Sequence, residues 1–301
     1  MTVDTEWREG RFVAHERKHK LLFGRVYEDS AIEAHAFAGA ERIFCIAAAG
    51  CTALSLSAEH EVVACDVNPA QIAYIERRLA GGGREVGSAE RIMSLMRALM
   101  PLAGWRRQRL NAFLALDDTQ AQLAFWHSQL DTWRFRSGLA LLLSPLWLGR
   151  FYSSNLLGSL PARFDRVLRA RLERCFARHP NRRNPYVRPL LLGEADIDSA
   201  PALPTGAARR PQLIVADAAA YLESCPAQSF GGTSLSNILD GTSPAYRARL
   251  FAAVRHAARP EAAVVLRSFG EPSSVLTTNR AREDRSLLWG VVDVRPAEAL
   301  A

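Results

Sequence analysis

The chain has 301 residues, of which 49% are hydrophobic and 23% are charged, and its formal net charge is +7. This composition is that of a globular protein and excludes a disordered chain, a collagen-like repeat and a simple coiled coil. Its 5 cysteines are odd in number and form no CxxC pair, which excludes a disulfide framework and a zinc ribbon. The charged N-terminus has no apolar signal core and no apolar run is long enough to span a bilayer, so we expect a cytoplasmic protein.

The first elements lie between residues 42 and 83. RIFCIA at 42–47 and EVVACD at 61–66 are short apolar runs rich in β-forming residues, and a helical stretch follows each of them. The second helix has Asn68 at its N-cap and Pro69 at its first position, and its apolar residues recur at helical spacing. The first half of a doubly wound, nucleotide-binding sheet has this order of elements: strand, small-residue turn, helix, strand ending in an acid, and helix.

This alternation stops after residue 83. From about Ser88 to Leu192 the patterns are mostly helical, and a stretch rich in proline and alanine at 198–212 is typical of a surface linker. Strand and helix patterns then resume at 213–224, 229–240, 244–258, 262–269 and 287–294. We therefore predict an α/β fold with a Rossmann-like core over 41–83 and 209–301. A helical insert over 84–208 separates the second and third strands, and an N-terminal helical lid occupies 1–40.

Ligands of such sheets bind at the carboxyl ends of the strands. Asp66 ends the second strand, where a carboxylate can accept hydrogen bonds from both ribose hydroxyls, and Asp217 is placed to face an adenine amino group. The alternative for Asp66 is a plain helix cap. The first turn has one glycine and no GxGxxG, which favours an adenosyl cofactor such as S-adenosylmethionine over NAD. The residues expected to bind it near the strand ends are Ala48, Gly50, Cys51, Asp66, Asn68, Gln71, Asp217, Ala218 and Ser236.

Six short motifs together resemble one known family. They are YED at 27–29, AGC at 49–51, DVNPAQ at 66–71, FWHSQL at 125–130, NPYVRPLLLGE at 184–194 and SLSNILD at 234–240. In this order they are similar to the motifs of the S-adenosylmethionine:diacylglycerol 3-amino-3-carboxypropyl transferases of betaine-lipid synthesis. The resemblance covers almost the whole chain, which is shorter than the lipid enzymes. It implies a core of class I methyltransferase type that takes S-adenosylmethionine as its substrate.

The resemblance also implies which carbon reacts. A nucleophile attacks the γ-carbon of the methionine arm rather than the methyl carbon, and methylthioadenosine is released. In-line approach within about 3–3.5 Å decides between the two carbons, so the site must hold the amino-acid arm. A guanidinium suits its carboxylate and an aromatic face suits its sulfonium. The candidates for these two tasks are Arg188 and Arg267 for the carboxylate, and Tyr27, Tyr152 and Tyr186 for the sulfonium.

The remaining candidates concern the amine, the acceptor and the proton. Asn184, Asn237 and Asp240 are expected to orient the amine or the acceptor, and Glu28 or Asp240 is the expected general base. The residues expected to carry catalysis are therefore Glu28, Tyr186, Asn237 and Asp240. Each has a structural alternative: an aromatic can cover a helix end, an arginine can pair with a nearby acid, and an aspartate can cap a helix.

The acceptor stays open between two groups. The hydroxyl of diacylglycerol is the acceptor that the resemblance implies. The α-amine of the substrate itself is the other, since its attack on the γ-carbon closes a four-membered ring and gives azetidine-2-carboxylate. An ordinary small-molecule methyltransferase is an alternative enzyme, because a fold does not fix a reaction. A non-enzymatic module that binds a nucleoside or a lipid is the alternative outside enzymes.

The expected partners follow from charge and apolar runs. Residues 84–190 carry a net charge of +11, which is better explained as a solvated arginine-rich surface, with an anionic partner such as a membrane surface, a nucleic acid or a carboxylate as the alternative. The run LALLLSPLWLG at 139–149 is better explained as core of the insert, with peripheral contact to a lipid surface as the alternative. The arginine-rich helix at 163–178 lacks the interleaved aromatics of a nucleic-acid platform. We expect no metal, since the spacing of His15 and His19 has no acidic or cysteine partner, and the sequence predicts no oligomeric state.

Overall fold

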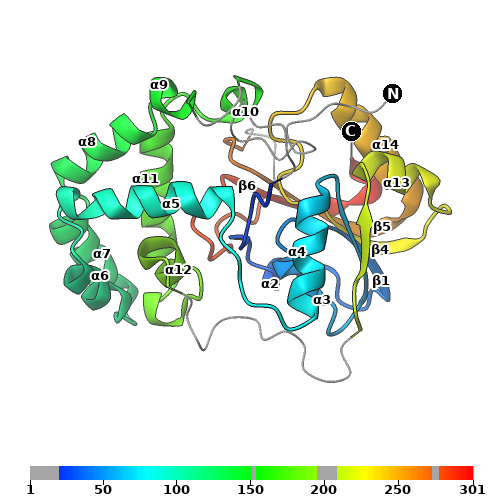
Figure 1. Ribbon diagram of the computed structural model, residues 1–301, viewed down its shortest axis with the longest axis horizontal. Helices are drawn as coiled ribbons and strands as arrows, with labels where there is room; N and C mark the ends of the chain where they lie inside the picture. The colour runs from blue at the N-terminus through cyan, green and yellow to red at the C-terminus, as the bar shows by residue number, and fades with distance from the viewer. Residues whose placement is uncertain (1–19, 151–153, 195–208, 273–277, 301) are drawn as a thin grey trace.

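The computed structural model describes residues 20–150, 154–194, 209–272 and 278–300, and a six-stranded sheet lies at its centre (Figure 1). The strands lie in the order β3-β2-β1-β4-β5-β6. The first five pair in parallel and β6 runs antiparallel to β5. The predicted α/β fold with a mostly parallel sheet is confirmed, and the topology is compatible with a Rossmann-like core. The strand bounds are β1 Arg42–Ile46, β2 Glu61–Asp66, β3 Gln212–Val215, β4 Phe230–Ser234, β5 Ala258–Ser268 and β6 Val291–Pro296.

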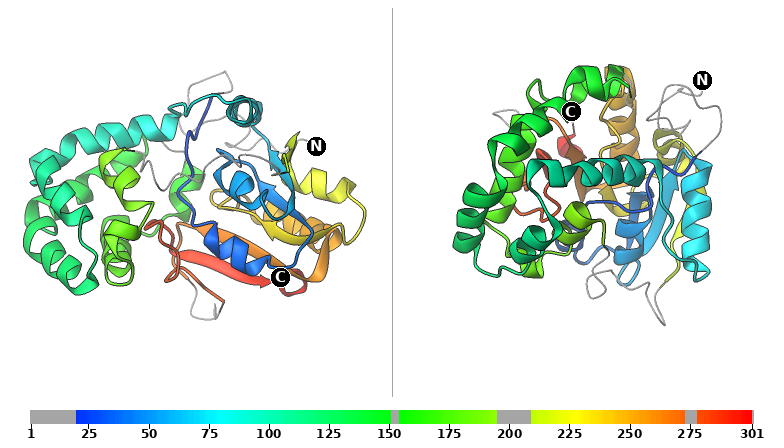
Figure 2. Two further views of the ribbon diagram at one scale, coloured as in Figure 1. Left: turned by 90° about the horizontal axis from the view of Figure 1, so that it is seen from below. Right: turned by 60° about the vertical axis from the view of Figure 1, so that its left-hand side comes forward.

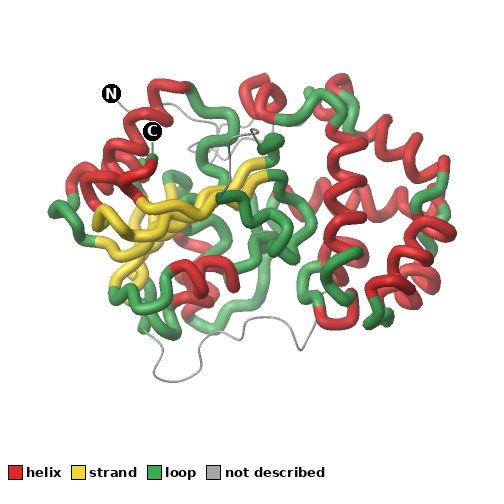
Figure 3. Tube along the Cα trace, turned by 180° about the vertical axis from the view of Figure 1, so that it is seen from behind, coloured by secondary structure: helices red, strands yellow, loops and turns green. Residues whose placement is uncertain are grey.

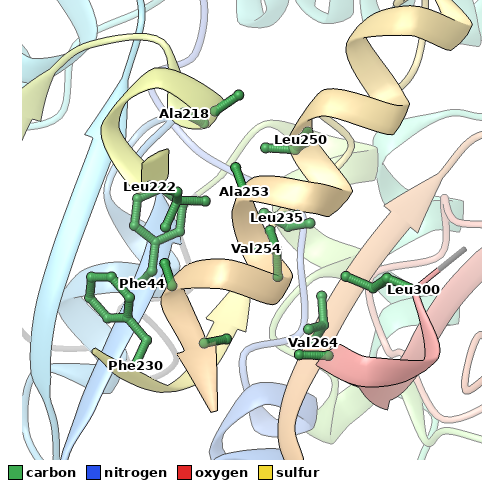
Figure 4. Packing of buried hydrophobic residues seen from close by; sticks show 14 of the residues in the cluster. Phe44, Ala218, Leu222, Phe230, Leu235, Leu250, Ala253, Val254, Val264 and Leu300 are labelled. Carbon is green, nitrogen blue, oxygen red and sulfur yellow. The ribbon is translucent and has the colours of Figure 1, made fainter. Parts of the chain in front are cut away.

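Helices cover both faces of the sheet because side chains alternate along each strand. Ile43 and Cys45 of β1 are buried against the first set of helices, whereas Phe44 between them is buried against the second set. Figure 4 shows Phe44 in this second layer, with Leu222 and Leu250 from the covering helices. The first set is α2 Ala31–Ala36, α3 Cys51–Leu56 and α4 Pro69–Leu79, and the second is α13 Ala218–Ser224 and α14 Pro244–Ala257.

The sheet order changes direction at β1, which has β2 on one side and β4 on the other. Successive strands are added outward from β1 to β3 on one side and from β4 to β6 on the other. The carboxyl ends of β1, β2 and β4 therefore meet where the crossover connections diverge, and this is where open α/β sheets bind ligands. The fold alone thus directs attention to the residues that follow these three strands.

The described residues between α4 and β3 form helices and no strand, as predicted for the insert. We call this part, residues 84–192, the helical unit. It has its own buried cluster around Trp105, Phe113, Trp126 and Phe176, and it lies beside the sheet rather than on either face (Figures 2 and 3). Its elements are α5 Ser88–Leu99, η1 Met100–Ala103, α6 Arg107–Leu114, α7 Thr119–Phe125, η2 Trp126–Leu130, α8 Trp133–Leu142, α9 Pro145–Leu148, α10 Ser154–Ser159, α11 Phe164–Phe176, η3 Asn181–Arg183 and α12 Val187–Leu192.

Some expected boundaries differ from the structure. The last strand starts at Val291, not Leu287, because Leu287 has a φ of 74° and the chain turns before it joins the sheet. Of the expected lid, residues 20–40 are described and contain one short helix, α2. Tyr152, the pair His15 and His19, and most of the expected linker lie outside the described residues. Within the described part of the chain, no helix has the length and apolar character needed to cross a membrane.

Candidate active site

One large cavity lies at the carboxyl edge of the sheet. Its volume is about 720 Å³, which is within the usual range for small-molecule sites. Four parts of the chain form its wall: the N-terminal segment 22–28, the residues that follow β1, β2, β3 and β4, the inner side of the helical unit, and Phe269, Leu288 and Trp289 between β5 and β6. The cavity therefore extends from the switch point of the sheet into the space enclosed by the helical unit.

The turn after β1 forms the first part of the wall. Ala48 lines the cavity and has a φ of 43°, a conformation that residues other than glycine rarely adopt. Gly50 follows with a φ of 79°, and a Cβ added there would lie 2.9 Å from Cγ1 of Ile75. Glycine is thus required at position 50 both for its backbone conformation and for the close approach of α4. Gly50 shapes the turn and does not itself line the cavity.

Asp66 is the last residue of β2 and lies at the carboxyl edge of the sheet. Its carboxylate accepts hydrogen bonds from the backbone N–H of Ala48 at 3.0 Å and of Asn68 at 2.8 Å, and it lines the cavity. Burial of the carboxylate raises the pKa of Asp66 to about 7, although both backbone hydrogen bonds oppose this rise. Each carboxylate oxygen keeps a further lone pair, so the group can accept two hydroxyl donors from a ligand.

Asn68 and Gln71 fasten the N-terminal segment to the edge. Asn68 caps α4, and its Nδ2 donates to the carbonyl of Lys20 at 2.9 Å. Gln71 accepts from the backbone N–H of Leu22 at 2.7 Å and donates to the carbonyl of Ala48 at 2.6 Å. Gln71 lines the cavity, whereas Asn68 is buried behind it. Both residues therefore position the segment that closes one side of the cavity.

Asp217 follows β3 and also lines the cavity. It caps α13 by accepting from the backbone N–H of Ala220 at 3.0 Å, and its second oxygen accepts from the hydroxyl of Tyr246 at 2.7 Å. Tyr246 is buried, lines the cavity and was missed by the sequence analysis. The sequence signal that could have identified Tyr246 is its position on the apolar stripe of α14, one turn before Leu250.

Ser236, which follows the carboxyl end of β4, contacts Glu28 of the N-terminal segment. Ser236 has a φ of 52° and its hydroxyl donates to the carboxylate of Glu28, whose second oxygen accepts from Thr52 at 3.3 Å. Burial raises the pKa of Glu28, and the charge of Arg267 opposes this rise. Glu28 and Ser236 both line the cavity. Strained backbone at both Ala48 and Ser236 marks this edge as a site held in shape by its surroundings.

Asp240 does not line the cavity, but its carboxylate holds residues that do. It accepts from the Ser268 hydroxyl at 2.6 Å and from the Phe269 backbone N–H at 3.0 Å, and it receives a third hydrogen bond from Nδ2 of Asn237 at 3.3 Å. Asn237 lines the cavity, but Asp240 does not. The structure therefore does not support Asp240 as the general base and instead gives it the task of orienting Asn237.

Arg267 is not available to hold a carboxylate of a ligand. It is fully buried, and it pairs with Glu33 directly, with Glu28 at 3.8 Å and with Asp284 at 3.5 Å. A second ion pair lies beside this group, since Asp29 pairs with Arg285 at 2.6 Å. The prediction that Arg267 binds the carboxylate of a ligand is wrong, because its guanidinium already pairs with three buried acids.

Four further candidates also lie away from the cavity wall. Arg188 pairs with Glu194 at 3.0 Å, and Tyr186 packs under the guanidinium of Arg285. Asn184 donates to the carbonyl of Arg285 at 2.9 Å, and Cys51 lies near Arg78 at 3.6 Å. By contrast, the structure does bring these predicted residues together around the cavity: Tyr27, Glu28, Ala48, Asp66, Gln71, Asp217, Ala218, Ser236 and Asn237.

The helical unit forms the apolar half of the cavity. Its lining consists mainly of leucine, methionine and aromatic side chains, and the charged groups there are Glu90, Arg97 and Arg134. Glu90 accepts from the backbone N–H groups of Gly24 and Arg25 and thus also fastens the N-terminal segment. The apolar lining comes from α5, η1, α8, α9, α10, α11 and α12, for example Met93, Met96, Phe135, Leu142, Leu156, Leu168 and Leu191.

His127, Asp131 and Glu173 lie close together on the helical unit, with their ligand atoms within 4.8 Å of one another. Asp131 is already paired with Arg136 and Arg169, each at 2.8 Å, and none of the three lines the cavity. The cluster is thus explained by ion pairs between helices. Comparison of the chain with protein-family models, with curated proteins and with solved structures finds no match.

Proposed function

We propose that this protein is a transferase that uses S-adenosylmethionine and transfers its 3-amino-3-carboxypropyl group to a hydroxyl of an apolar, lipid-like acceptor. Methylthioadenosine is the second product. The observation that carries the proposal is a single cavity with two chemically different halves. One half has acids at the strand ends of a sheet compatible with a Rossmann-like core, and the other is apolar and belongs to the helical unit.

The polar half suits an adenosyl group. Asp66 has lone pairs for two ribose hydroxyls, and Asp217 follows β3, the strand next to β2, where an adenine would extend. The turn after β1 brings the backbone N–H of Ala48 to the Asp66 carboxylate, but this turn has one glycine and no glycine-rich loop for a pyrophosphate. A nucleoside without phosphates therefore fits better than a dinucleotide. We assign the core to the class I methyltransferase type on these grounds.

The apolar half suits an acceptor with hydrocarbon chains. A small polar acceptor would leave most of this lining in contact with water, which is unfavourable for apolar surface. Leucine and methionine side chains from seven elements of the helical unit instead offer a continuous apolar wall. Methionine adapts its shape to irregular chains, which suits Met93, Met96 and Met100 to this place. The motifs that resemble the betaine-lipid transferases support the same class of acceptor.

When bound, S-adenosylmethionine supplies an electrophilic γ-carbon and a thioether leaving group. A hydroxyl oxygen of the acceptor forms the new bond to the γ-carbon, the bond from this carbon to sulfur breaks, and its electron pair stays on sulfur. Glu28 is a cavity-lining carboxylate with a raised pKa, and Ser236 donates to it, so this pair can accept the hydroxyl proton. Asn237, oriented by Asp240, is placed to fix the amino-acid arm or the acceptor.

The intramolecular cyclase is the second candidate, and the apolar lining favours it in one respect. An amine surrounded by apolar groups is more easily neutral, because burial disfavours the charged form. A neutral α-amine could attack the γ-carbon and give azetidine-2-carboxylate with methylthioadenosine. This reaction requires no acceptor chamber, so the volume of the apolar half favours the lipid acceptor.

Product analysis tests the proposal. Purified protein is incubated with S-adenosylmethionine, with and without diacylglycerol in detergent micelles, and the products are identified by mass spectrometry. We expect methylthioadenosine and a carboxypropylated lipid to form together and only when the lipid is present. Azetidine-2-carboxylate in the absence of lipid would support the cyclase instead. S-adenosylhomocysteine would show methyl transfer and overturn the proposal.

A further inference from the structure

Six of the exposed large apolar side chains gather on four helical elements, α5, η1, α8 and α9, that border the apolar half of the cavity. Leu95 and Leu99 lie on α5 and Leu102 on η1, at spacings that place them along one side of the helix. Leu102 and Leu146 are 76% and 89% exposed, unusual values for leucine. We call the following six residues the rim surface: Leu95, Leu99, Leu102, Trp133, Leu141 and Leu146.

The rim surface includes the mouth of the cavity. Leu99, Leu102 and Leu141 are exposed and also line the cavity, so the apolar lining reaches the outside at these residues. η1 and α8 are held together, since the hydroxyl of Thr132 donates to the carbonyl of Ala103 at 3.4 Å. Figure 1 shows α5, α8 and α9 on the same side of the molecule, away from the sheet. An apolar molecule outside the rim surface can therefore enter without crossing a polar layer.

Arginines accompany the apolar side chains. Arg134 lies over the ring of Trp133 at 5.6 Å, and Arg150 lies over the ring of Trp147 at 5.8 Å. Arg106 follows η1 and is exposed, and no carboxylate among the described residues forms an ion pair with Arg106 or Arg134. Tryptophan with arginine at the edge of an apolar surface is typical of the boundary between lipid tails and headgroups.

We infer that the rim surface docks on the face of an anionic lipid bilayer, with its leucines and Trp133 among the acyl chains and its arginines at the headgroups. The inference rests on the proposed function in one respect, because the bilayer supplies the apolar acceptor to the mouth of the cavity. The net charge of +11 over residues 84–190 attracts such a surface, and salt weakens this attraction. A second copy of the chain carries the same positive charge, so self-association through this surface is disfavoured.

Vesicle flotation tests the inference with the full chain. The protein is mixed with vesicles of phosphatidylcholine alone, or of equal parts phosphatidylcholine and phosphatidylglycerol, without S-adenosylmethionine. The test variant is Leu95→Asp/Leu146→Asp, whose two positions belong to the rim surface but do not line the cavity. Val86→Asp is the matched control, since Val86 is 60% exposed and lies outside the rim surface.

We expect binding to the anionic vesicles that decreases with salt and is weaker on phosphatidylcholine alone. The double variant should partition at least about tenfold less, because two charges enter the apolar boundary, and Val86→Asp should bind like the unchanged protein. Equal binding of the double variant, or no binding of the unchanged protein, would overturn the inference. A change from dimer to monomer in the double variant would show a subunit interface and overturn it as well.

Two parallel measurements separate this inference from the proposed function. Calorimetric titration with S-adenosylmethionine should give the same affinity for the double variant as for the unchanged protein. If the protein binds S-adenosylmethionine and modifies lipid in micelles but ignores vesicles, the docking surface is wrong and the function stands. If it binds vesicles through the rim surface but forms no product from the lipid, the function is wrong and the docking surface stands.

Discussion

At the scale of single residues, Asp66 links the fold to the proposed chemistry. Its place at the end of the second strand was predicted from the pattern EVVACD, and in the structure it is the last residue of β2 and lines the cavity. Its raised pKa could not be read from the sequence, because burial of the carboxylate depends on the helical unit and the N-terminal segment that enclose the edge. This pKa has a consequence for binding that can be measured.

We expect the affinity for S-adenosylmethionine to depend on pH through Asp66. The pKa of the carboxylate in the empty site is about 7, and ribose hydroxyls that donate to it favour the ionised form, so binding lowers this pKa. The affinity is then complete above pH 7 and falls as the pH drops below 7, by up to about tenfold per unit. Calorimetric titrations at about pH 6 and pH 8 measure this change, and Asp66→Asn should abolish it. An equal slope in Asp66→Asn would contradict the assignment.

Arg267 illustrates a residue whose type was noticed but whose task was mistaken. Its position at the end of β5 was predicted, whereas its pairing with Glu33, Glu28 and Asp284 depends on segments far apart in the chain. Nothing in the sequence near Arg267 reports this pairing. The three acids instead make Arg267 important for folding.

We expect Arg267→Ala to lower the free energy of unfolding by about 3–5 kcal/mol, because it leaves buried carboxylates without their cation. Arg280→Ala is the matched control, since Arg280 and Glu283 form an exposed pair, and its loss should cost less than about 1 kcal/mol. Urea denaturation followed by circular dichroism measures both. Similar losses for the two variants would show that the buried group is not held by Arg267.

At the scale of elements, the sheet and its covering helices agree closely with those predicted from the sequence. The continuous apolar runs of β1 and β2 and the N-cap at Asn68 are local signals, and the structure confirms them with buried strand interiors and a capped α4. The helical unit was predicted as helices, but its apolar run at 139–149 was expected to form core. In the structure Leu148 is buried and Leu139 packs against the buried cluster, as expected of core, but Leu139, Leu142 and Leu148 also line the cavity. Periodicity identifies an apolar face and cannot distinguish packed core from the wall of a chamber.

Gly138 on α8 offers a test of that chamber. It lines the cavity, and a Cβ added there would meet nothing within 4 Å. We expect Gly138→Phe to fill part of the apolar half and raise KM for diacylglycerol about tenfold, in line with the usual effect of a changed apolar pocket. The affinity for S-adenosylmethionine should not change. Gly158→Phe is the control, because Gly158 also has open space but does not line the cavity. Equal effects of the two variants would show that the chamber does not hold the acceptor.

At the scale of the whole molecule, the cavity exists because two units meet along the carboxyl edge of the sheet. The position of the insert between β2 and β3 was predicted, and together with the strand order of the sheet it places the helical unit beside this edge. The volume of the cavity was not predictable, because it depends on how far α5 and α8 stand apart. The N-terminal segment completes the enclosure through hydrogen bonds to Gln71 and Glu90.

The account depends first on whether S-adenosylmethionine binds at this edge. The most direct measurement is calorimetric titration of the ligand into the unchanged protein, Asp66→Ala and, as a control, Glu283→Ala, which removes an exposed carboxylate. We expect saturable binding that Asp66→Ala weakens at least about tenfold, since each hydrogen bond to a charged group contributes about 1.5–3 kcal/mol, and that Glu283→Ala leaves unchanged. Absence of binding by the unchanged protein, or an unchanged affinity in Asp66→Ala, would contradict the account.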